Sequence, residues 1–241
     1  MANRKISIIL PVLNESLVFR DLKKIEEEFT RLNQNFEIIC VFDSGAEKSS
    51  SKLRLPHLPH VVPLFYPVAR FGTGFARCYG FNKSKGSLIF FFEGNFSISP
   101  EEFLLYLNLM ETARADIVIG SKRHPLSRVY YSSFRHLISK IYHLLVRIIF
   151  GLNVTDTQVG LKLYKRRVLN EVIPRIIIKN WGFDLEILVV AHALGFKRIV
   201  EAPIEIKRHF TSREITSNNI SNLLRDTLAI AYRKYWLKYY Q

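Results

Sequence analysis

Short apolar runs alternate with longer helix-like segments in the first half of this chain, and that alternation constrains its fold more than any other feature. Four such runs, rich in Ile, Val and Phe and bounded by turn residues, cover residues 5–10, 36–42, 87–92 and 116–119. A helix pattern covers residues 17–32, and the capping-box sequence Ser99-Pro100-Glu101-Glu102 starts another. The alternation predicts an α/β fold, with a mostly parallel sheet between two layers of helices.

The second half contains more helix and fewer strands. Its patterns predict helices over residues 132–150, 166–173, 183–194 and 221–241, and strands over 160–164 and 199–206. Internal repeats and proline-rich linkers are absent from the sequence, so we expect one domain over residues 1–241. Within it, residues 1–120 and 121–241 form two halves of different character.

Charge separates the two halves. The formal net charge is +14; residues 1–120 hold 14 Lys and Arg against 13 Asp and Glu, and residues 121–241 hold 21 against 8. This asymmetry predicts that the second half binds an anionic partner: nucleic acid, an anionic membrane surface or a phosphorylated substrate.

Hydropathy and cysteine usage predict the cell compartment. The sequence lacks both an apolar run of roughly 20 residues, the length of a spanning helix, and a signal-peptide pattern. Cys40 and Cys78 are expected to be buried, reduced thiols. We therefore expect a soluble, cytoplasmic protein.

Polar residues follow the first two predicted strands, and ligands of doubly wound sheets bind at the carboxyl ends of strands. Pro11, Asn14 and Glu15 follow the first strand, where Asn and Glu can cap a helix or bond a ribose and base. Asp43 follows the second strand, where it can accept from ribose hydroxyls or form a turn. Taken alone, Asn14 and Glu15 favour the helix cap, while the two alternatives for Asp43 are equally plausible.

Glycines precede the next predicted helix. Gly72 and Gly74 can let backbone N–H groups approach a phosphate, and Arg77 adds positive charge. The third glycine of a dinucleotide-binding motif is missing, so this motif alone is a weak indication.

Two groups of charged or oxygen-bearing residues follow later strands. Glu93 and Asn95 can hold a hard divalent cation, Mg²⁺ or Mn²⁺, although a polar turn explains them equally well. Lys122 and Arg123 place two cations where a phosphate can sit, and the alternative is a solvated loop.

Taken in order, these motifs resemble family 2 glycosyltransferases of the GT-A fold, in particular the polyprenyl-phosphate (dolichol-phosphate) mannose and glucose synthases. The resemblance covers about residues 5–215. Its marks are LPVLNE at 10–15, the glycines at 72, 74, 80 and 86 with Arg77, DIVIGS at 116–121, DTQVGLK at 156–162, GFDLE at 182–186, and API at 202–204 followed by Arg208. It implies a Rossmann-like, mostly parallel central sheet.

The resemblance also implies roles for single residues. The nucleotide is expected to be surrounded by Pro11, Asn14, Glu15 and Asp43. A divalent metal is expected at Glu93 and Asn95. The lipid phosphate and sugar diphosphate are expected to bind Lys122, Arg135, Ser139 and Arg208. The sugar and acceptor pocket is expected to be shaped by Asp156, Gln158 and Asp184.

The implied function is an inverting transfer of sugar from a GDP- or UDP-sugar to a polyprenyl or dolichyl phosphate. Such an acceptor is already anionic, so the protein needs cations to hold it rather than a general base. An alcohol acceptor would need a carboxylate base, with Asp156 or Asp184 as the candidate.

The sequence departs from the family pattern at three places. Thr73 stands where Lys or a similar residue is common. Phe42 precedes Asp43 where paired Asp is usual, and the metal motif is Glu93-Gly94-Asn95 rather than Asp-x-Asp, so a weak metal site is expected. The alternative function is a catalytically impaired relative that binds nucleotide, lipid or a membrane-protein partner.

The helix predicted over 132–150 has a basic stripe opposite apolar residues. The stripe consists of His136, Lys140, His143 and Arg147. Such a helix can lie on an anionic membrane surface or pack on the core, and the aromatic-basic tail from Tyr232 can be a second anchor. We expect peripheral membrane association. A nucleic-acid partner is not expected, because no nucleic-acid-binding module is present in the sequence.

Overall fold

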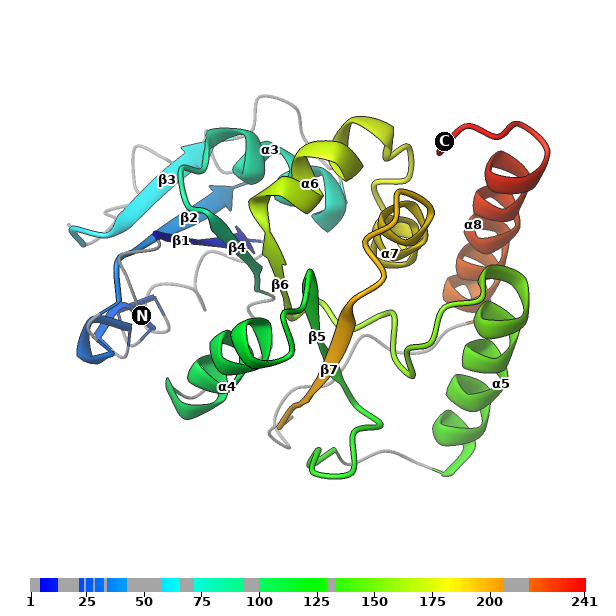
Figure 1. Cartoon of the computed structure of the whole chain (residues 1–241), viewed down its shortest axis with the longest axis horizontal. Helices are drawn as coiled ribbons and strands as arrows, with labels where there is room; N and C mark the ends of the chain where they lie inside the picture. Colours follow the sequence, from blue (N-terminus) through cyan, green and yellow to red (C-terminus); the bar gives the residue numbers. More distant parts are fainter. Residues whose placement is uncertain are drawn as a thin grey trace.

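The computed structural model of the chain describes residues 5–12, 22–23, 25–27, 29–32, 34–42, 58–65, 72–92, 100–129, 133–205 and 217–241. At residues 100, 101, 133–136 and 217 it describes the backbone alone. A sheet forms the centre, helices cover both of its faces, and two helices lie at one end (Figure 1). The predicted mostly parallel α/β fold is confirmed.

Over the described residues, the sheet has seven strands in the order β3-β2-β1-β4-β6-β5-β7. Their bounds are β1 Ile6–Val12, β2 Phe36–Phe42, β3 Val61–Phe65, β4 Leu88–Phe91, β5 Ile117–Ser121, β6 Lys162–Lys165 and β7 Ile199–Pro203. Strands β1, β2, β4 and β5 are buried at every residue, as the continuous apolar runs predict for strands covered on both faces.

The direction of β6 determines which loops meet at the site. All other strands run parallel to one another, so their carboxyl ends share one edge of the sheet. Because β6 is antiparallel to β4 and β5, its first residue, Lys162, lies at that edge, paired with Phe91 and Ile119. The loop 151–161 therefore reaches the same edge as the residues that follow β5.

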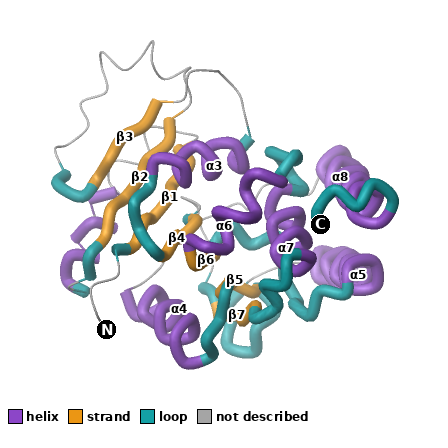
Figure 2. The backbone as a smooth tube through the Cα atoms, turned by 45° about the horizontal axis from the view of Figure 1, so that its top comes forward, coloured by secondary structure: helices purple, strands orange, loops and turns teal. Residues whose placement is uncertain are grey.

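Helices cover the two faces of the sheet (Figure 2). On one face lie α3 Thr73–Lys83, α6 Arg166–Val172 and α7 Phe183–Ala193, with a 3₁₀ turn at Ile173–Arg175. On the other lie α4 Pro100–Thr112 and the helical residues between 22 and 31. Each face of the sheet packs against its helices to form a hydrophobic core. Successive strand residues point into opposite cores, as Phe91 and Phe90 of β4 do.

Three features of the sheet differ from the prediction. The sequence does not predict β3, which contains Pro63, pairs with β2 at the sheet edge and is half exposed; proline is tolerated at such an edge. The reversed direction of β6 is not predicted either. The last strand is also shorter than predicted and ends at Pro203, although Glu205 still forms a bridge to Arg128.

The two helices at the end of the sheet are α5 Ser133–Phe150 and α8 Ser217–Tyr235, and they lie side by side. The Tyr142 hydroxyl lies 3.1 Å from Thr227 Oγ1, and Lys234 Nζ donates to the Phe150 carbonyl at 3.3 Å. The tail helix is predicted over residues 221–241, and the observed α8, Ser217–Tyr235, begins and ends earlier. Within the described residues, no helix is long and apolar enough to cross a membrane.

Candidate functional site

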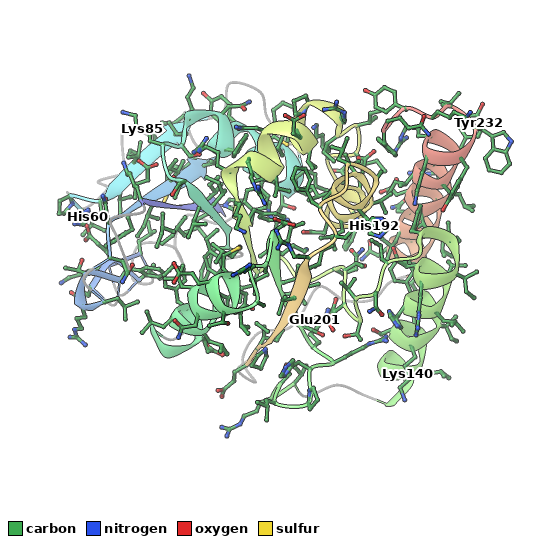
Figure 3. All side chains as sticks on the ribbon, viewed as in Figure 1. His60, Lys85, Lys140, His192, Glu201 and Tyr232 are labelled. Atoms are coloured by element: carbon green, nitrogen blue, oxygen red, sulfur yellow. The ribbon has the colours of Figure 1, made fainter. Side chains whose placement is uncertain are left out.

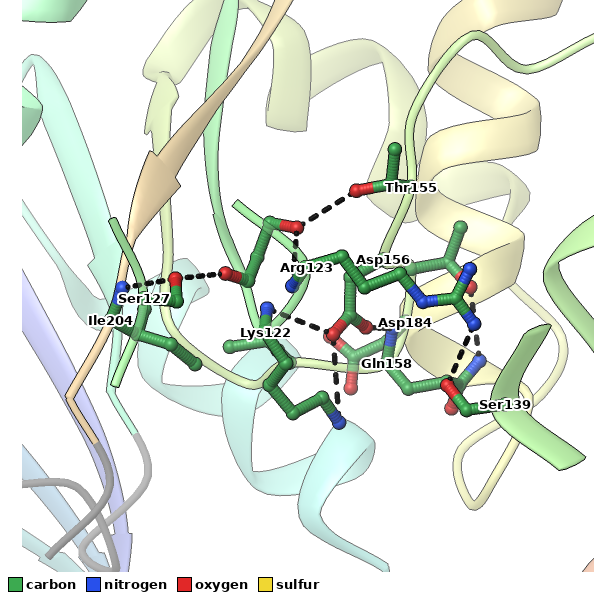
Figure 4. A network of polar contacts seen from close by, with 12 residues as sticks. Lys122, Arg123, Ser127, Ser139, Thr155, Asp156, Gln158, Asp184 and Ile204 are labelled. Atoms are coloured by element: carbon green, nitrogen blue, oxygen red, sulfur yellow. Dashed lines mark hydrogen bonds and ion pairs between the residues drawn. The ribbon is translucent and has the colours of Figure 1, made fainter. Parts of the chain in front are cut away.

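The carboxyl edge of the sheet brings together Lys122, Asp156, Gln158 and Ser139, four of the residues that the sequence predicts for the site (Figure 4). Asp156 lies in the loop before β6 and Lys122 follows β5. The backbone N–H of Lys122 donates to Asp156 Oδ2 at 3.2 Å, and Lys122 Nζ lies 3.6 Å from the same atom. The other oxygen, Oδ1, accepts from the N–H of Gln158 at 3.0 Å. The largely buried Asp156 carboxylate therefore joins the two loops.

Glu201 of β7 fixes the backbone that carries Asp156. Its Oε1 accepts from the N–H groups of Thr155 and Asp156, at 2.8 and 3.1 Å. The Thr155 hydroxyl lies 2.7 and 2.9 Å from its two oxygens and 2.9 Å from Ser121 Oγ. One carboxylate thus links β7, the Asp156 loop and the end of β5.

Arg123 connects the site to α5. Its Nη2 donates to Ser139 Oγ at 2.9 Å, and its backbone N–H donates to Ser121 Oγ at 3.2 Å. Figure 4 shows its side chain extending past Asp156 toward Ser139. Partial burial lowers the pKa of the Arg123 guanidinium, and the nearby carboxylates of Asp156 and Glu201 oppose that shift.

His143 lies one turn beyond Ser139 on α5. Burial lowers the pKa of its imidazole below the ordinary value of 6.5, and Arg123 and Arg147 lower it further. The carboxylates of Glu201 and Asp156 act in the opposite direction. At neutral pH His143 is therefore an uncharged hydrogen-bonding group beside the cations.

Asp184, at the start of α7, is paired with two buried cations. Lys162 Nζ lies 2.5 Å from its Oδ1 and Arg77 Nη1 lies 2.9 Å from its Oδ2. Lys162 also donates to the Val159 carbonyl at 2.5 Å, which ties the pair to the Asp156 loop. Burial raises the pKa of Asp184, but Arg77 and Lys162 outweigh it and hold the pKa below its ordinary value.

The start of α3 differs from its predicted arrangement. The sequence places Arg77 beside a phosphate, whereas the structure buries its side chain completely against Asp184. Gly74 lies so close to α7 that an added Cβ would be 2.5 Å from the ring of Phe183. An added Cβ on Gly72 would be 2.0 Å from Asn180 Oδ1. Close packing thus gives a reason for both glycines that is independent of any phosphate.

The remaining predicted residues are only partly described. Pro11 is buried near the end of β1, in register with Val41 of β2. Arg135 lies in the first turn of α5, and its side chain is outside the description. The residues predicted for the base, metal and second phosphate contact lie outside the described residues, namely Asn14, Glu15, Asp43, Glu93, Asn95 and Arg208. Elsewhere in the described chain, no group of three His, Cys, Asp or Glu side chains is placed to hold a metal ion.

The sequence names Arg123 only as one of two cations where a phosphate can sit, and it does not show which of the two turns toward α5. Glu201 and Lys162 receive no role from the sequence. Glu201 is an acidic residue inside an apolar strand, and this is the signal that could have identified it. Lys162 carries the same signal at the start of β6, where it is completely buried.

Comparison with known proteins agrees with this geometry. The family model described as glycosyl transferase family 2 matches residues 7–173, and the chain belongs to this family. The fold is shared with crystal structures of glucosyl-3-phosphoglycerate synthase from Mycobacterium tuberculosis, one of them with phosphoglyceric acid bound. That match has a TM-score of 0.66 and 17% identity and covers 97% of this chain and 80% of the other. The class defined by fold and family is thus a GT-A glycosyltransferase of family 2.

Curated relatives act on lipid phosphates according to their names. A dolichyl-phosphate beta-glucosyltransferase of Trichomonas vaginalis is 26% identical over 205 residues, which cover 82% of this chain and 59% of the relative. The Dictyostelium discoideum dolichyl-phosphate beta-glucosyltransferase is 26% identical over 80% of this chain and 64% of its own length. An undecaprenyl-phosphate mannosyltransferase of Micrococcus luteus is 35% identical over 52% of this chain and 49% of its own length. The matches thus span less than two thirds of these relatives.

Proposed function

We propose that this chain is an inverting glycosyltransferase that moves a sugar from a nucleoside-diphosphate sugar to a polyprenyl or dolichyl phosphate. The observation that carries the proposal is the cluster of Lys122, Arg123 and Ser139 at the carboxyl edge of the sheet, beside a helix whose outer side is apolar. A polyprenyl phosphate has an anionic head, which matches the cationic cluster, and a hydrocarbon tail, which matches the apolar side of the helix.

The chemistry needs positioning more than proton transfer. A phosphate monoester is anionic at neutral pH, so its oxygen attacks the anomeric carbon without a general base. The bond from that carbon to the nucleoside diphosphate breaks, and the diphosphate leaves with the electron pair. A single displacement inverts the configuration at the anomeric carbon. The protein must hold two anions close together, which favours lysine and arginine side chains.

The acceptor side of the site is built from the second half of the chain. In this proposal Lys122, Arg135 and Arg208 hold the acceptor phosphate and the diphosphate. Asp156 and Gln158 orient the sugar, and Asp184 supports their loop through Lys162. The curated relatives named for dolichyl and undecaprenyl phosphate support this class of acceptor.

The donor side is built from the first half. Pro11, Asn14, Glu15 and Asp43 surround the base and ribose, and backbone groups near Gly72 face the diphosphate. Glu93 and Asn95 hold Mg²⁺ or Mn²⁺, which neutralises charge on the diphosphate when bound. Support for a metal comes from the related synthase fold, which has been crystallised with Mn²⁺ and UDP-glucose. Asn95 is neutral, so this site binds its ion weakly.

Two exposed apolar stripes support a position on a membrane surface. On α5 the stripe is Leu137, Ile141, Leu144 and Ile148, which are 55–74% exposed. On α8 the exposed residues are Leu224, Leu228, Tyr232 and Tyr235, followed by Trp236. Lys140 and Arg147, also exposed, flank the α5 stripe. Figure 3 shows Lys140 and Tyr232 on the outer parts of α5 and α8. Apolar side chains with flanking cations fit an anionic lipid surface.

Turnover tests the proposed activity. The purified chain is incubated with GDP-mannose, GDP-glucose, UDP-glucose or UDP-mannose and a short isoprenyl phosphate, with Mg²⁺ or Mn²⁺. Product with at least one donor supports the proposal, and the absence of product from every pairing contradicts it. The double change Glu93→Asp and Asn95→Asp tests the alternative, since activity gained only by this variant would identify a catalytically impaired relative.

Vesicle flotation tests the membrane position. We expect the chain to float with vesicles that contain anionic lipid and to remain below with neutral vesicles. Ile141→Ser combined with Leu144→Ser should abolish flotation, while Val62→Ser, a change at an exposed apolar residue on β3, should not. If the double change leaves flotation unaffected, the apolar stripe of α5 does not bind the membrane. The stripe would then be expected to contact another partner, such as a membrane protein.

A further inference from the structure

The C-terminal helix α8 contacts the start of α7, the helix that carries Asp184. Figures 1 and 2 show α7 between the sheet and α8. Asp226 of α8 accepts through its Oδ2 from the backbone N–H of Gly182, the residue that caps α7, at 2.9 Å. Arg233, two turns further along α8, donates to Glu186 Oε1 at 2.9 Å. The apolar stripe of α8 faces outward, and the contacts with α7 lie on its other side.

Asp226 and Gly182 fit closely against each other. An added Cβ on Gly182 would lie 2.6 Å from the Cβ of Asp226 and 3.1 Å from its Oδ2. The backbone of Gly182 has φ −80° and ψ −3°, a conformation that does not require glycine, so the closeness of α8 explains the residue. A carboxylate at the start of a helix is also favoured by the helix dipole. This pair therefore fixes where α8 lies against the first turn of α7.

The first turn of α7 is connected to the loop that the proposed function assigns to the sugar. Asp184, two residues after Gly182, pairs with Lys162 at 2.5 Å. Lys162 donates to the carbonyl of Val159, which lies in the same loop as Asp156. These groups are largely buried and closely packed, so a displacement of the first turn of α7 displaces the loop as well.

We infer that Asp226 is a positioning residue for sugar transfer. It acts through other residues, because it fixes Gly182 and the first turn of α7, and this turn fixes the loop of Asp156. The inference rests on the proposed function. It gives α8 two roles, since its outer side is assigned to a membrane surface and its inner side supports the site.

Steady-state kinetics with a short isoprenyl phosphate such as citronellyl phosphate test the assignment. Asp226→Ala should lower kcat about tenfold and leave both KM values within about twofold, because it misaligns the reacting sugar without removing a substrate contact. Asp226→Asn keeps a side-chain oxygen that can accept from Gly182, so it should retain at least about half of kcat. Gly182→Ala disturbs the same contact from the side of α7 and should lower kcat as Asp226→Ala does.

Tyr240→Phe is the matched control. It also removes one hydrogen bond to α7, but at Glu186, and it leaves the contact between Asp226 and Gly182 intact. It should lower the urea midpoint as Asp226→Ala does and leave kcat unchanged. An equal loss of kcat in both variants would overturn the inference, because general loosening of the C-terminal residues would then explain the effect.

Amide exchange gives a readout that does not depend on turnover. Asp226→Ala should speed exchange in the loop 151–161 and at the start of α7, whereas Tyr240→Phe should speed it only near the end of α8. Exchange in the loop that is unchanged by Asp226→Ala overturns the inference. If Asp226→Ala does not fold, the comparison of Gly182→Ala with Asp226→Asn takes its place.

The outcomes separate this inference from the function on which it rests. If the unmodified chain shows no turnover with any donor, the proposed function fails, and amide exchange still tests the connection from Asp226 to the loop. If the unmodified chain turns over, an unchanged kcat in Asp226→Ala overturns the inference alone. A change confined to either KM overturns it too, because Asp226 would then affect binding rather than alignment.

Discussion

The Oε1 atom of Glu201 accepts a hydrogen bond from the backbone N–H of Asp156 at 3.1 Å, so a partly buried carboxylate of β7 fixes the loop that presents the Asp156 carboxylate. The same oxygen accepts from the N–H of Thr155. Neither Thr155 nor Asp156 lies in a helix or strand, and this carboxylate supplies the acceptor that regular structure would otherwise supply.

Removing the Glu201 carboxylate should impair turnover more than folding. We expect Glu201→Ala to lower kcat about ten- to a hundredfold, because a displacement of Asp156 by about 1 Å is enough to misalign the reacting groups. Glu205→Ala, a change at an exposed residue just beyond β7, should leave kcat unchanged. Equal kcat values for both variants would contradict a positioning role. Circular dichroism shows that each variant is folded.

Replacing Asp184 should destabilise the whole fold. Asp184→Asn leaves Lys162 and Arg77 buried beside a neutral amide, and breaking a buried pair from one side costs about 3–5 kcal/mol. Urea unfolding measures this loss. The control is Glu171→Gln, which breaks an i,i+4 pair with Arg175 near the surface and should cost less than about 0.5 kcal/mol. Similar losses in the two variants would show that the Asp184 pairs contribute little.

The C-terminal residues depend on a buried carboxylate in α7. Glu186 Oε1 accepts from Arg233 Nη2 at 2.9 Å and from the Tyr240 hydroxyl at 2.5 Å. Tyr240→Phe should lower the free energy of unfolding by about 1–2 kcal/mol and speed amide exchange near the end of α8. Tyr239→Phe removes a hydroxyl from the neighbouring exposed ring and should change neither quantity. Equal exchange rates in the two variants would contradict this anchor.

His143 should make stability depend on pH below neutrality. Its folded pKa lies below the unfolded value of about 6.5, because of burial and the charges of Arg123 and Arg147. Well above pH 6.5 both states are neutral and the residue contributes no pH dependence. As the pH falls from 6.5 through the lowered pKa, the unfolded state binds the proton first, so stability decreases. Urea midpoints of His143→Gln should fall less over this window, and identical pH profiles would contradict the shift.

Much of the fold could be predicted because a strand that is buried on both faces appears in the sequence as a short, continuous apolar run. The runs that became β1, β2, β4 and β5 are apolar throughout, since helices cover both sides of them. Strand β3 was missed because it lies at the edge, is half exposed and contains Pro63. The direction of β6 depends on its neighbours, and no local pattern specifies it.

The site could be predicted where residues follow strands and not where partners are distant in sequence. Lys122, Asp156 and Gln158 come together because β5 and the reversed β6 meet at one edge, and the Arg123 side chain joins them to Ser139 of α5. The pairing of Arg77 with Asp184 spans 107 positions, and sequence alone offers no reason for an arginine near two glycines to turn into the core. Glu201 accepts from the backbone N–H groups of Thr155 and Asp156. Every residue except proline has such a group, so the side chains of the partner residues do not indicate this contact in the sequence.

The choice of acceptor tests the central claim most directly. Radiolabelled sugar transfer from the best donor is measured in parallel with citronellyl phosphate and with citronellol, which differ only in the phosphate. We predict product with citronellyl phosphate, with the configuration at the anomeric carbon inverted relative to the donor, and none with citronellol. Equal transfer to both acceptors, or transfer to the alcohol alone, would contradict a site built to hold a phosphate at the edge formed by β5 and β6.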